Sequence, residues 1–156
     1  MSVADVKAYL AQYGLESRVK EFSVSSATVE LAAAALSVAP ARIAKTLSFK
    51  TEQGALLVVT AGDARIDNAK FKAAFNTKAK MLAHQEVEQA IGHAVGGVCP
   101  FAIPAEVPIY LDASMKRFET IYPAAGSANS AAEMTPAELE ITSHARGWVD
   151  VCKDWA

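Results

Sequence analysis

The segments RIAKTLSFK (residues 42–50), TEQG (51–54) and ALLVVTA (55–61) decide the fold class. The first segment spaces Ile43, Leu47 and Phe49 as a strand does, and the last is a short continuous apolar run typical of a buried strand. Glu, Gln and Gly between them are a turn signal. The three segments therefore predict an antiparallel hairpin.

Working outward on the N-terminal side, apolar residues at helical spacing predict a helix over residues 3–13, which Gly14 ends. A short β-branched strand is expected over residues 18–24. Thr28 is suited to cap a second helix, and Pro40 lies beyond the end of that helix. The hairpin is thus preceded by two helices and one short strand.

On the C-terminal side, Asp67 is suited to cap a helix that runs to Phe75. A Gly- and Pro-rich loop follows further on, and Thr135 with Pro136 marks a helix start. The remaining predicted elements are a strand over 79–83, a helix over 84–91 ended by Gly92, a strand over 107–115, a segment 118–123 paired with it, a strand before 134, and a last strand over 147–151. Helices and strands alternate irregularly without repeats or linkers, which predicts a single α+β domain over residues 1–156 and not a doubly wound sheet.

The composition places the chain among globular proteins. Its 156 residues are 52% hydrophobic and 21% charged, with a formal net charge of −2. This charge argues against a general nucleic-acid coat protein, and no DNA partner is expected. Seven basic residues lie within residues 45–80, where we expect either a solvated lysine face or a local basic patch.

Three features that the sequence lacks predict the cellular compartment of the protein. Two cysteines, Cys99 and Cys152, are too few for a disulfide framework. The N-terminus has no uninterrupted apolar core of the kind a signal peptide needs. The most apolar segments are too short to span a bilayer. We therefore expect a cytoplasmic protein without a membrane partner.

Several common sites are absent from the sequence. It contains no GxGxxG, GxxxxGK[ST], GxSxG or HExxH pattern, so no cofactor is expected. His93 and Cys99 are six residues apart, but no second close pair completes a zinc site, and no metal is expected. Cys99 precedes Pro100 in a loop and is conceivable as a nucleophile. A partly buried, small apolar role for Cys99 is favoured over that one.

Four features could carry chemistry, and each has a structural alternative. Lys45, followed by Thr46, is a cation near the start of an apolar strand, or a lysine whose stem passes the core. The loop GGVCPF (96–101) could present backbone N–H groups to an oxyanion, or form an ordinary turn. Asp112 at a strand end could equally cap a turn. The corner formed by Gly126 and Ser127 could equally reflect close packing.

The order of these features resembles a known family. RIAKTLSFK, GDARIDNAKFK, GGVCPF, VPIYLDASM and AAGS follow one another as in the YbaK/ProX family, also called YbaK/EbsC. This family comprises the insertion-type editing domain of bacterial prolyl-tRNA synthetases and its free-standing relatives. The resemblance runs from the first helix to beyond Ser127 and is weaker after about Glu133. It implies a mixed, mostly antiparallel, barrel-like sheet surrounded by helices.

The resemblance also implies an activity and a site. Members hydrolyse the ester between a wrong amino acid and the 3′ CCA end of a tRNA. Lys45 would contact the phosphate or sugar of the terminal adenosine, which suits a compact cation with three donors. Gly96 and Gly97 would face the scissile carbonyl. The substrate-binding residues would be Phe22, Thr46, Val98, Pro100, Phe101, Asp112, Gly126 and Ser127.

No general base is evident among these residues, and the resemblance implies that groups of the substrate help to activate the attack. We therefore expect a trans-acting deacylase whose substrate is tRNA-Pro carrying a small wrong amino acid, with prolyl-tRNA synthetase as a candidate partner. The alternative is a non-catalytic module of the same fold that binds tRNA or a synthetase.

Overall fold

The computed structural model describes residues 2–93 and 98–155 of the chain. Within these ranges the protein contains five α-helices, which the structure orders along the chain as α1 (Val3–Ala11), α2 (Val29–Leu36), α3 (Asn68–Phe75), α4 (His84–Ile91) and α5 (Pro136–Ser143). Short 3-10 turns η1, η2 and η3 cover Glu16–Arg18, Pro40–Arg42 and Ala113–Arg117. None of the helices described is both long and apolar enough to cross a membrane.

The strands form one larger sheet and two small ones. In chain order they are β1 (Val19–Glu21), β2 (Ile43–Thr51), β3 (Gly54–Ala61), β4 (Arg65–Ile66), β5 (Ile109–Asp112), β6 (Tyr122–Pro123), β7 (Ser130–Ala132), β8 (Gly147–Val149) and β9 (Cys152–Lys153). The larger sheet has the order β6-β2-β3-β5-β8, whereas β1 pairs with β7 and β4 pairs with β9.

The predicted hairpin is confirmed and is the longest pairing in the sheet. β2 and β3 pair antiparallel over eight residue pairs, from Ala44 opposite Ala61 to Thr51 opposite Gly54. Leu56 to Val59 on β3 are almost completely buried, as expected for a continuous apolar run with both faces covered. The hairpin is therefore the framework on which the remaining strands assemble.

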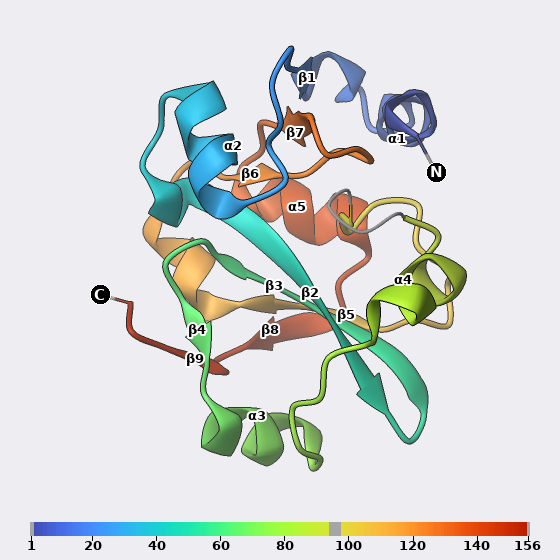
Figure 1. Ribbon diagram of the computed structural model, residues 1–156, viewed down its shortest axis with the longest axis vertical. Coiled ribbons are helices and arrows are strands. Elements are labelled where there is room, and N and C mark those ends of the chain that lie inside the picture. The colour runs from blue at the N-terminus through green and yellow to red at the C-terminus, as the bar shows by residue number, and fades with distance from the viewer. Residues whose placement is uncertain (1, 94–97, 156) are drawn as a thin grey trace.

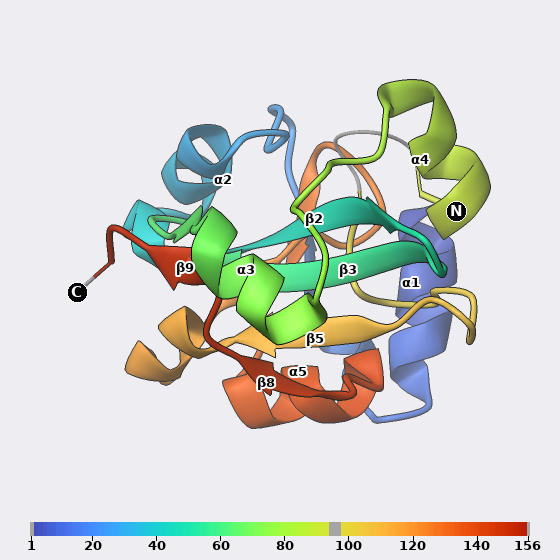
Figure 2. The same ribbon diagram turned by 90° about the horizontal axis from the view of Figure 1, so that it is seen from below.

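The sheet is mixed, as predicted. β6 joins β2, β5 joins β3 and β8 joins β5, all in parallel and over only two or three residue pairs each. The antiparallel hairpin contributes eight residue pairs to the larger sheet, as many as its three parallel pairings together. The sheet curls into a half-barrel, with α2 and α4 on one side and α5 on the other (Figures 1 and 2).

Two strand predictions need correction. Residues 118–123 do not pair with the strand at 107–115, because β3 and β8 occupy the two edges of β5. Tyr122 and Pro123 instead pair with β2, at an edge where a proline without an N–H group is tolerated. Residues 79–83 form only one antiparallel bridge, between Met81 and Phe49.

The predicted helix starts are confirmed by side-chain caps. Thr28 accepts a hydrogen bond from the N–H of Leu31, and Asp67 accepts one from the N–H of Lys70. Thr135 and Glu138 form a reciprocal capping box at the start of α5. These caps satisfy N–H groups that have no partner within the helix.

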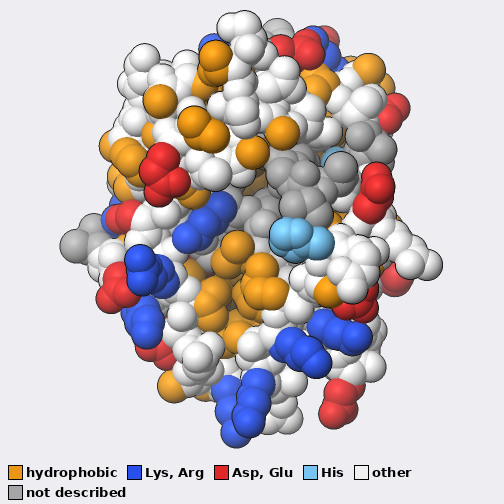
Figure 3. Space-filling view, viewed as in Figure 1, with side chains coloured by type: hydrophobic (Ala, Val, Ile, Leu, Met, Phe, Trp, Pro, Cys, Tyr) orange, Lys and Arg blue, Asp and Glu red, His pale blue; other side chains and the backbone are white. Residues whose placement is uncertain are grey.

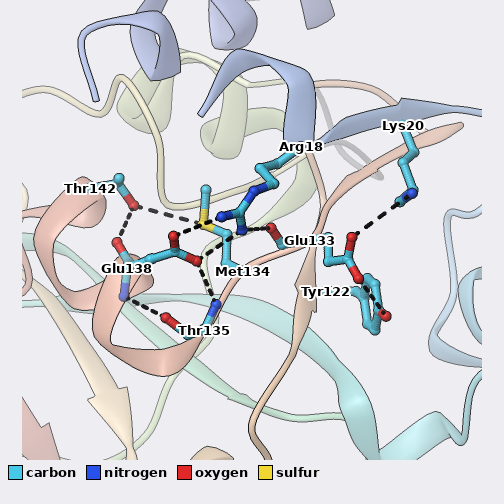
Figure 4. A network of polar contacts seen from close by, with 8 residues as sticks. All are labelled: Arg18, Lys20, Tyr122, Glu133, Met134, Thr135, Glu138 and Thr142. Atoms are coloured by element: carbon cyan, nitrogen blue, oxygen red, sulfur yellow. Dashed lines mark hydrogen bonds and ion pairs between the residues drawn. The ribbon is translucent and has the colours of Figure 1, made fainter. Parts of the chain in front are cut away.

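A polar network ties α5 to the start of the chain (Figure 4). The guanidinium of Arg18 donates to both carboxylate oxygens of Glu138, at 3.0 and 3.1 Å, and to the carbonyl of Glu133 at 3.1 Å. Burial acts to raise the pKa of Glu138, but hydrogen bonds from Thr135 and Arg18 outweigh it and hold this pKa below its usual value. The Glu133 carboxylate accepts a hydrogen bond from the hydroxyl of Tyr122 on β6. The network therefore fixes the position of Tyr122 beside β2.

Candidate active site

The outer edge of β2 is shared by two segments that leave a gap between them. β6 pairs with Ile43 and Ala44 at the start of β2. At its other end, the N–H of Leu82 donates to the carbonyl of Ser48 at 3.0 Å, and the N–H of Lys50 donates to the carbonyl of Lys80 at 2.7 Å. Backbone groups on one edge of a strand belong to every second residue. The N–H and C=O of Thr46 therefore point into the gap.

A cavity of about 450 Å³ opens at this gap. Its lining comes from the segment before α2, from α2 itself, from β2, from the start of α4 and from the corner near β7. Its polar lining residues are Ser26, Thr28, Lys45, Thr46, Ser48, His84, Tyr122 and Ser130, and its apolar ones include Ala27, Ala32, Ala44, Ala124, Ala131, Met81 and Val98. On the face drawn in Figure 3, a basic side chain and a histidine lie near the centre, above a group of hydrophobic side chains.

Lys45 is half-buried at the wall of this cavity. Its ammonium group donates a hydrogen bond to the carbonyl of Ala64 at 2.5 Å. Burial lowers the pKa of Lys45, and Arg65 adds to this effect, while Cys152, Asp63 and Glu30 oppose it. The lysine is therefore a partly desolvated cation, and charge attraction is stronger there than in water.

Two hydroxyl groups in the cavity wall have no partner within the described ranges. The Oγ of Ser26 and the Oγ1 of Thr46 are buried and make no hydrogen bond there. Buried polar groups are nearly always hydrogen-bonded, because leaving one unpaired costs about 1–3 kcal/mol. These hydroxyls, with the Lys45 ammonium, suit the cavity for a ligand with several polar atoms.

The predicted glycine loop reaches the cavity at Val98, which is part of the lining. Gly96 and Gly97 lie outside the described residues. Phe101 is fully buried in the core, and Pro100 lines a second cavity, of about 370 Å³, next to Tyr9. The structure thus brings Lys45, Thr46 and Val98 together and gives Pro100 and Phe101 packing positions.

Cys99 is completely buried, and burial raises the pKa of its thiol to about 12. Its sulfur lies 3.5 Å from the Nε2 of His93, whose pKa is lowered, chiefly by burial. That imidazole nitrogen also lies 2.8 Å from the carbonyl oxygen of Phe101. A neutral thiol beside a neutral imidazole is not an activated nucleophile, so the structure favours the packing role for Cys99.

Asp112 is also buried, and its carboxylate is engaged by the backbone. One oxygen accepts from the N–H of Ser114 at 3.0 Å, and the other accepts from the N–H of Val151 at 2.9 Å. Asp112 is not part of the described cavity lining. Its contacts brace η3 and the C-terminal segment, which corresponds to the capping alternative.

The corner at 126–127 lies next to the cavity lining. The Oγ of Ser127 is 2.8 Å from that of Ser130, which does line the cavity. Gly126 has a φ of +97°, and a Cβ there would come within 2.8 Å of the carbonyl oxygen of Ser2. Close packing against α1 therefore accounts for the glycine at position 126.

The predicted residue Phe22 lies outside the described cavity lining. It is half-buried, and its backbone is hydrogen-bonded to Asn129.

Three lining residues had no signal in the sequence. His84, Met81 and Tyr122 come from separate segments that meet only through the shared edge of β2. Spacing along the chain cannot show such a meeting. Within residues 2–93 and 98–155, no three His, Cys, Asp or Glu side chains gather in a way that could hold a metal ion.

Known proteins resemble the chain over its whole length or over part of it. The uncharacterized protein YwhH of Bacillus subtilis is 50% identical over 156 residues, with 99% of each chain covered. A protein of Enterococcus faecalis, provisionally named as the Cys-tRNA(Pro)/Cys-tRNA(Cys) deacylase EbsC, is 29% identical over 74% of this chain and 73% of its own. The proline–tRNA ligase of Bacillus pumilus is 33% identical over 90 residues, which are 57% of this chain and 16% of the ligase.

Solved structures and a family model agree with these relatives. A crystal structure described provisionally as a trans-editing enzyme for prolyl tRNA synthetase superposes with a TM-score of 0.87 at 28% identity, covering 97% of this chain and 96% of the other. The hypothetical protein APE2540 gives 0.85 at 29% identity, covering 95% and 99%. The model of the aminoacyl-tRNA editing domain matches residues 24–141. The chain therefore belongs to the aminoacyl-tRNA editing domain family, of the YbaK/EbsC type.

Proposed function

We propose that the protein is an aminoacyl-tRNA deacylase that hydrolyses the ester of a mischarged tRNA in the cavity beside Lys45. One observation carries this proposal: Lys45 and Val98 line the same cavity as two buried hydroxyls, of Ser26 and Thr46, that have no partner in the described chain. A cation and several donors beside apolar walls suit the 3′-terminal adenosine and a small amino acid. Family membership supports the same reaction class.

The reaction needs little from the protein beyond positioning and polarisation. Water attacks the ester carbonyl carbon, the resulting oxyanion collapses, and the bond to the ribose oxygen breaks. That oxygen takes a proton, and free amino acid and uncharged tRNA are released. In this scheme Lys45 holds a phosphate or the sugar, and the N–H of Thr46 is a donor within reach of the developing oxyanion. Groups of the substrate assist the activation of water.

The proposal extends to the amino acid that is removed and to the tRNA that carries it. Five alanines, Ala27, Ala32, Ala44, Ala124 and Ala131, form the apolar wall together with larger residues such as Val29, Ile43 and Leu47. We propose that the group beside this wall is a small wrong amino acid, although one methylene changes binding by only about 1–3 kcal/mol. The likeness to part of a proline–tRNA ligase supports tRNA-Pro as the substrate and the synthetase as a partner. We propose that the protein acts in trans, on tRNA released from the synthetase.

A deacylation screen tests the proposal. Purified protein is incubated with tRNA-Pro carrying alanine, serine, threonine, cysteine or proline, and release of the amino acid is followed over time. We expect release of at least one small wrong amino acid. Lys45→Ala is expected to lower kcat/KM by about 100-fold or more, as for other groups that contact the transition state. Lys45→Arg should retain part of the activity.

Lys7→Ala is the matched control, because Lys7 lies on α1 and pairs with Glu21 at the surface. It should leave the rate unchanged. Hydrolysis no faster than in buffer for every substrate would overturn the proposal. Tight binding of charged tRNA without turnover would select the alternative, a non-catalytic tRNA- or synthetase-binding module.

A further inference from the structure

Basic residues are concentrated in one part of the chain. Residues 45–80 hold seven of the 15 Lys and Arg but only three of the 17 Asp and Glu. In Figure 3 basic side chains gather on the lower half of the face, where α3 and the segment after it lie in Figure 1. A chain with a net charge of −2 thus carries a local positive surface next to its cavity.

The core holds this surface in place. Phe71 of α3 packs against Phe49 of β2 with tilted rings whose centroids are 4.7 Å apart, and Phe75 continues the aromatic series to Tyr110 of β5. With its apolar side anchored in this way, α3 exposes Lys70 and Lys72 to solvent. Lys78 and Lys80 are exposed on the segment that leads from α3 to Met81.

Three of these lysines, Lys72, Lys78 and Lys80, form what we call the lysine row. No member of the row has an ion-pair partner in the described ranges. By contrast, Lys50 pairs with Glu86 at 3.3 Å, and Lys70 pairs with Asp150 at 3.2 Å. Unpaired, exposed ammonium groups are available to neutralise phosphates and to release counterions.

The row leads directly to the cavity. Lys80 precedes Met81, a cavity-lining residue whose side chain is 52% exposed. The backbone at Lys80 is held against β2 by the hydrogen bond from Lys50. The opposite rim is formed by α2, which exposes Glu30. A polyanionic strand that leaves the cavity is therefore attracted towards the row.

We propose that the lysine row binds the phosphates of the tRNA acceptor arm while its 3′ end occupies the cavity. This inference rests on the proposed function, since it takes the 3′ end as the ligand of the cavity. RNA fits because its phosphates repeat along one strand, whereas its unstacked 3′ bases offer apolar faces to the exposed Met81.

The test is a triple variant, Lys72→Gln, Lys78→Gln and Lys80→Gln. The matched control, Lys7→Gln, Lys20→Gln and Lys116→Gln, removes the same charge from α1, β1 and η3. Binding of 3′-amide-linked aminoacyl-tRNA is measured by fluorescence anisotropy from 50 to 300 mM KCl. We expect the row variant to weaken binding at least tenfold and to reduce the slope of log Kd against log salt by about 2–3. The control should change the slope by less than 1.

A second readout separates this surface from the cavity. Hydrolysis of an aminoacylated CCA trinucleotide, which lacks the acceptor arm, should be the same for the row variant and the wild type within twofold. Equal tRNA binding by the row and control variants would overturn the inference, and so would an equal loss on the trinucleotide. Absence of all hydrolysis would overturn the proposed function alone, because the binding slopes do not depend on turnover.

Discussion

Lys45 differs from a solvated lysine because its ammonium group is both partly buried and held by a hydrogen bond. Its ammonium group is partly desolvated, which strengthens its attraction for an anion, and it is held by the carbonyl of Ala64. The same burial makes the charge easier to lose as the pH rises. Its role can therefore be tested by pH as well as by substitution.

We expect ligand binding to weaken at alkaline pH, with a midpoint below the ordinary lysine value of 10.5, because burial lowers the pKa of Lys45. The protonated form attracts phosphate, so affinity is full below the lowered pKa and declines as the pH rises through it. The measurement is the Kd of an amide-linked aminoacyl CCA trinucleotide between pH 7 and 11.

Lys45→Arg is the control for this profile, because a guanidinium stays charged throughout that range. The variant should bind with little change up to pH 11. An unchanged alkaline decline in the variant would assign the decline to another group and remove Lys45 from phosphate binding.

At this scale the sequence predicted the strand that carries Lys45, and this lysine lines the cavity, but the sequence could not show which other candidate residues lie beside it. Lys45 and Thr46 lie on a strand whose pattern is clear, so their place follows from the hairpin. The Asp112 carboxylate is engaged by the N–H of Val151, which is distant in the chain, and Phe101 packs in the core with its carbonyl oxygen beside the His93 imidazole. Side-chain type alone does not reveal such partners.

Among the secondary-structure elements, those set by neighbouring residues were predicted correctly, whereas the pairing of residues 118–123 with a strand distant in sequence was not. The hairpin, the three helices with predicted caps and the turn at Gly54 follow from residues that are neighbours in sequence. The place of β6 depends on which sheet edge is already occupied, and two residues carry too little pattern to show this. The split edge of β2, which opens the cavity, arises from that placement.

Gly126 gives a test of how the corner before β7 packs on α1. We expect Gly126→Ala to destabilise the protein by about 2–4 kcal/mol, because the residue has a positive φ and the added Cβ would meet the backbone of Ser2. Urea unfolding followed by circular dichroism measures the change.

Gly147→Ala is the matched control, since a Cβ there meets no atom within 4 Å and φ is not positive. It should change stability by less than about 0.5 kcal/mol or raise it slightly. Equal effects of the two substitutions would show that the corner does not need glycine for packing.

For the whole molecule, the basic surface and the cavity lie next to each other along one edge of β2. The cavity opens where β2 lacks a neighbour, and the basic surface begins at the Met81 side of the same edge. The sequence contained the basic stretch, but either a solvated face or a patch was consistent with it. Its adjacency to the cavity is a property of the fold, because α3 and β2 are brought together by an aromatic cluster.

The account depends on the cavity beside Lys45 receiving the aminoacylated 3′ end. A crystal structure of the protein with an amide-linked alanyl-adenosine 5′-phosphate tests this directly. The account predicts the alanyl group between Thr46 and Val98, with the Lys45 ammonium within hydrogen-bond distance of a phosphate or sugar oxygen. Binding of the analogue at another site, with no contact to Lys45, would contradict it.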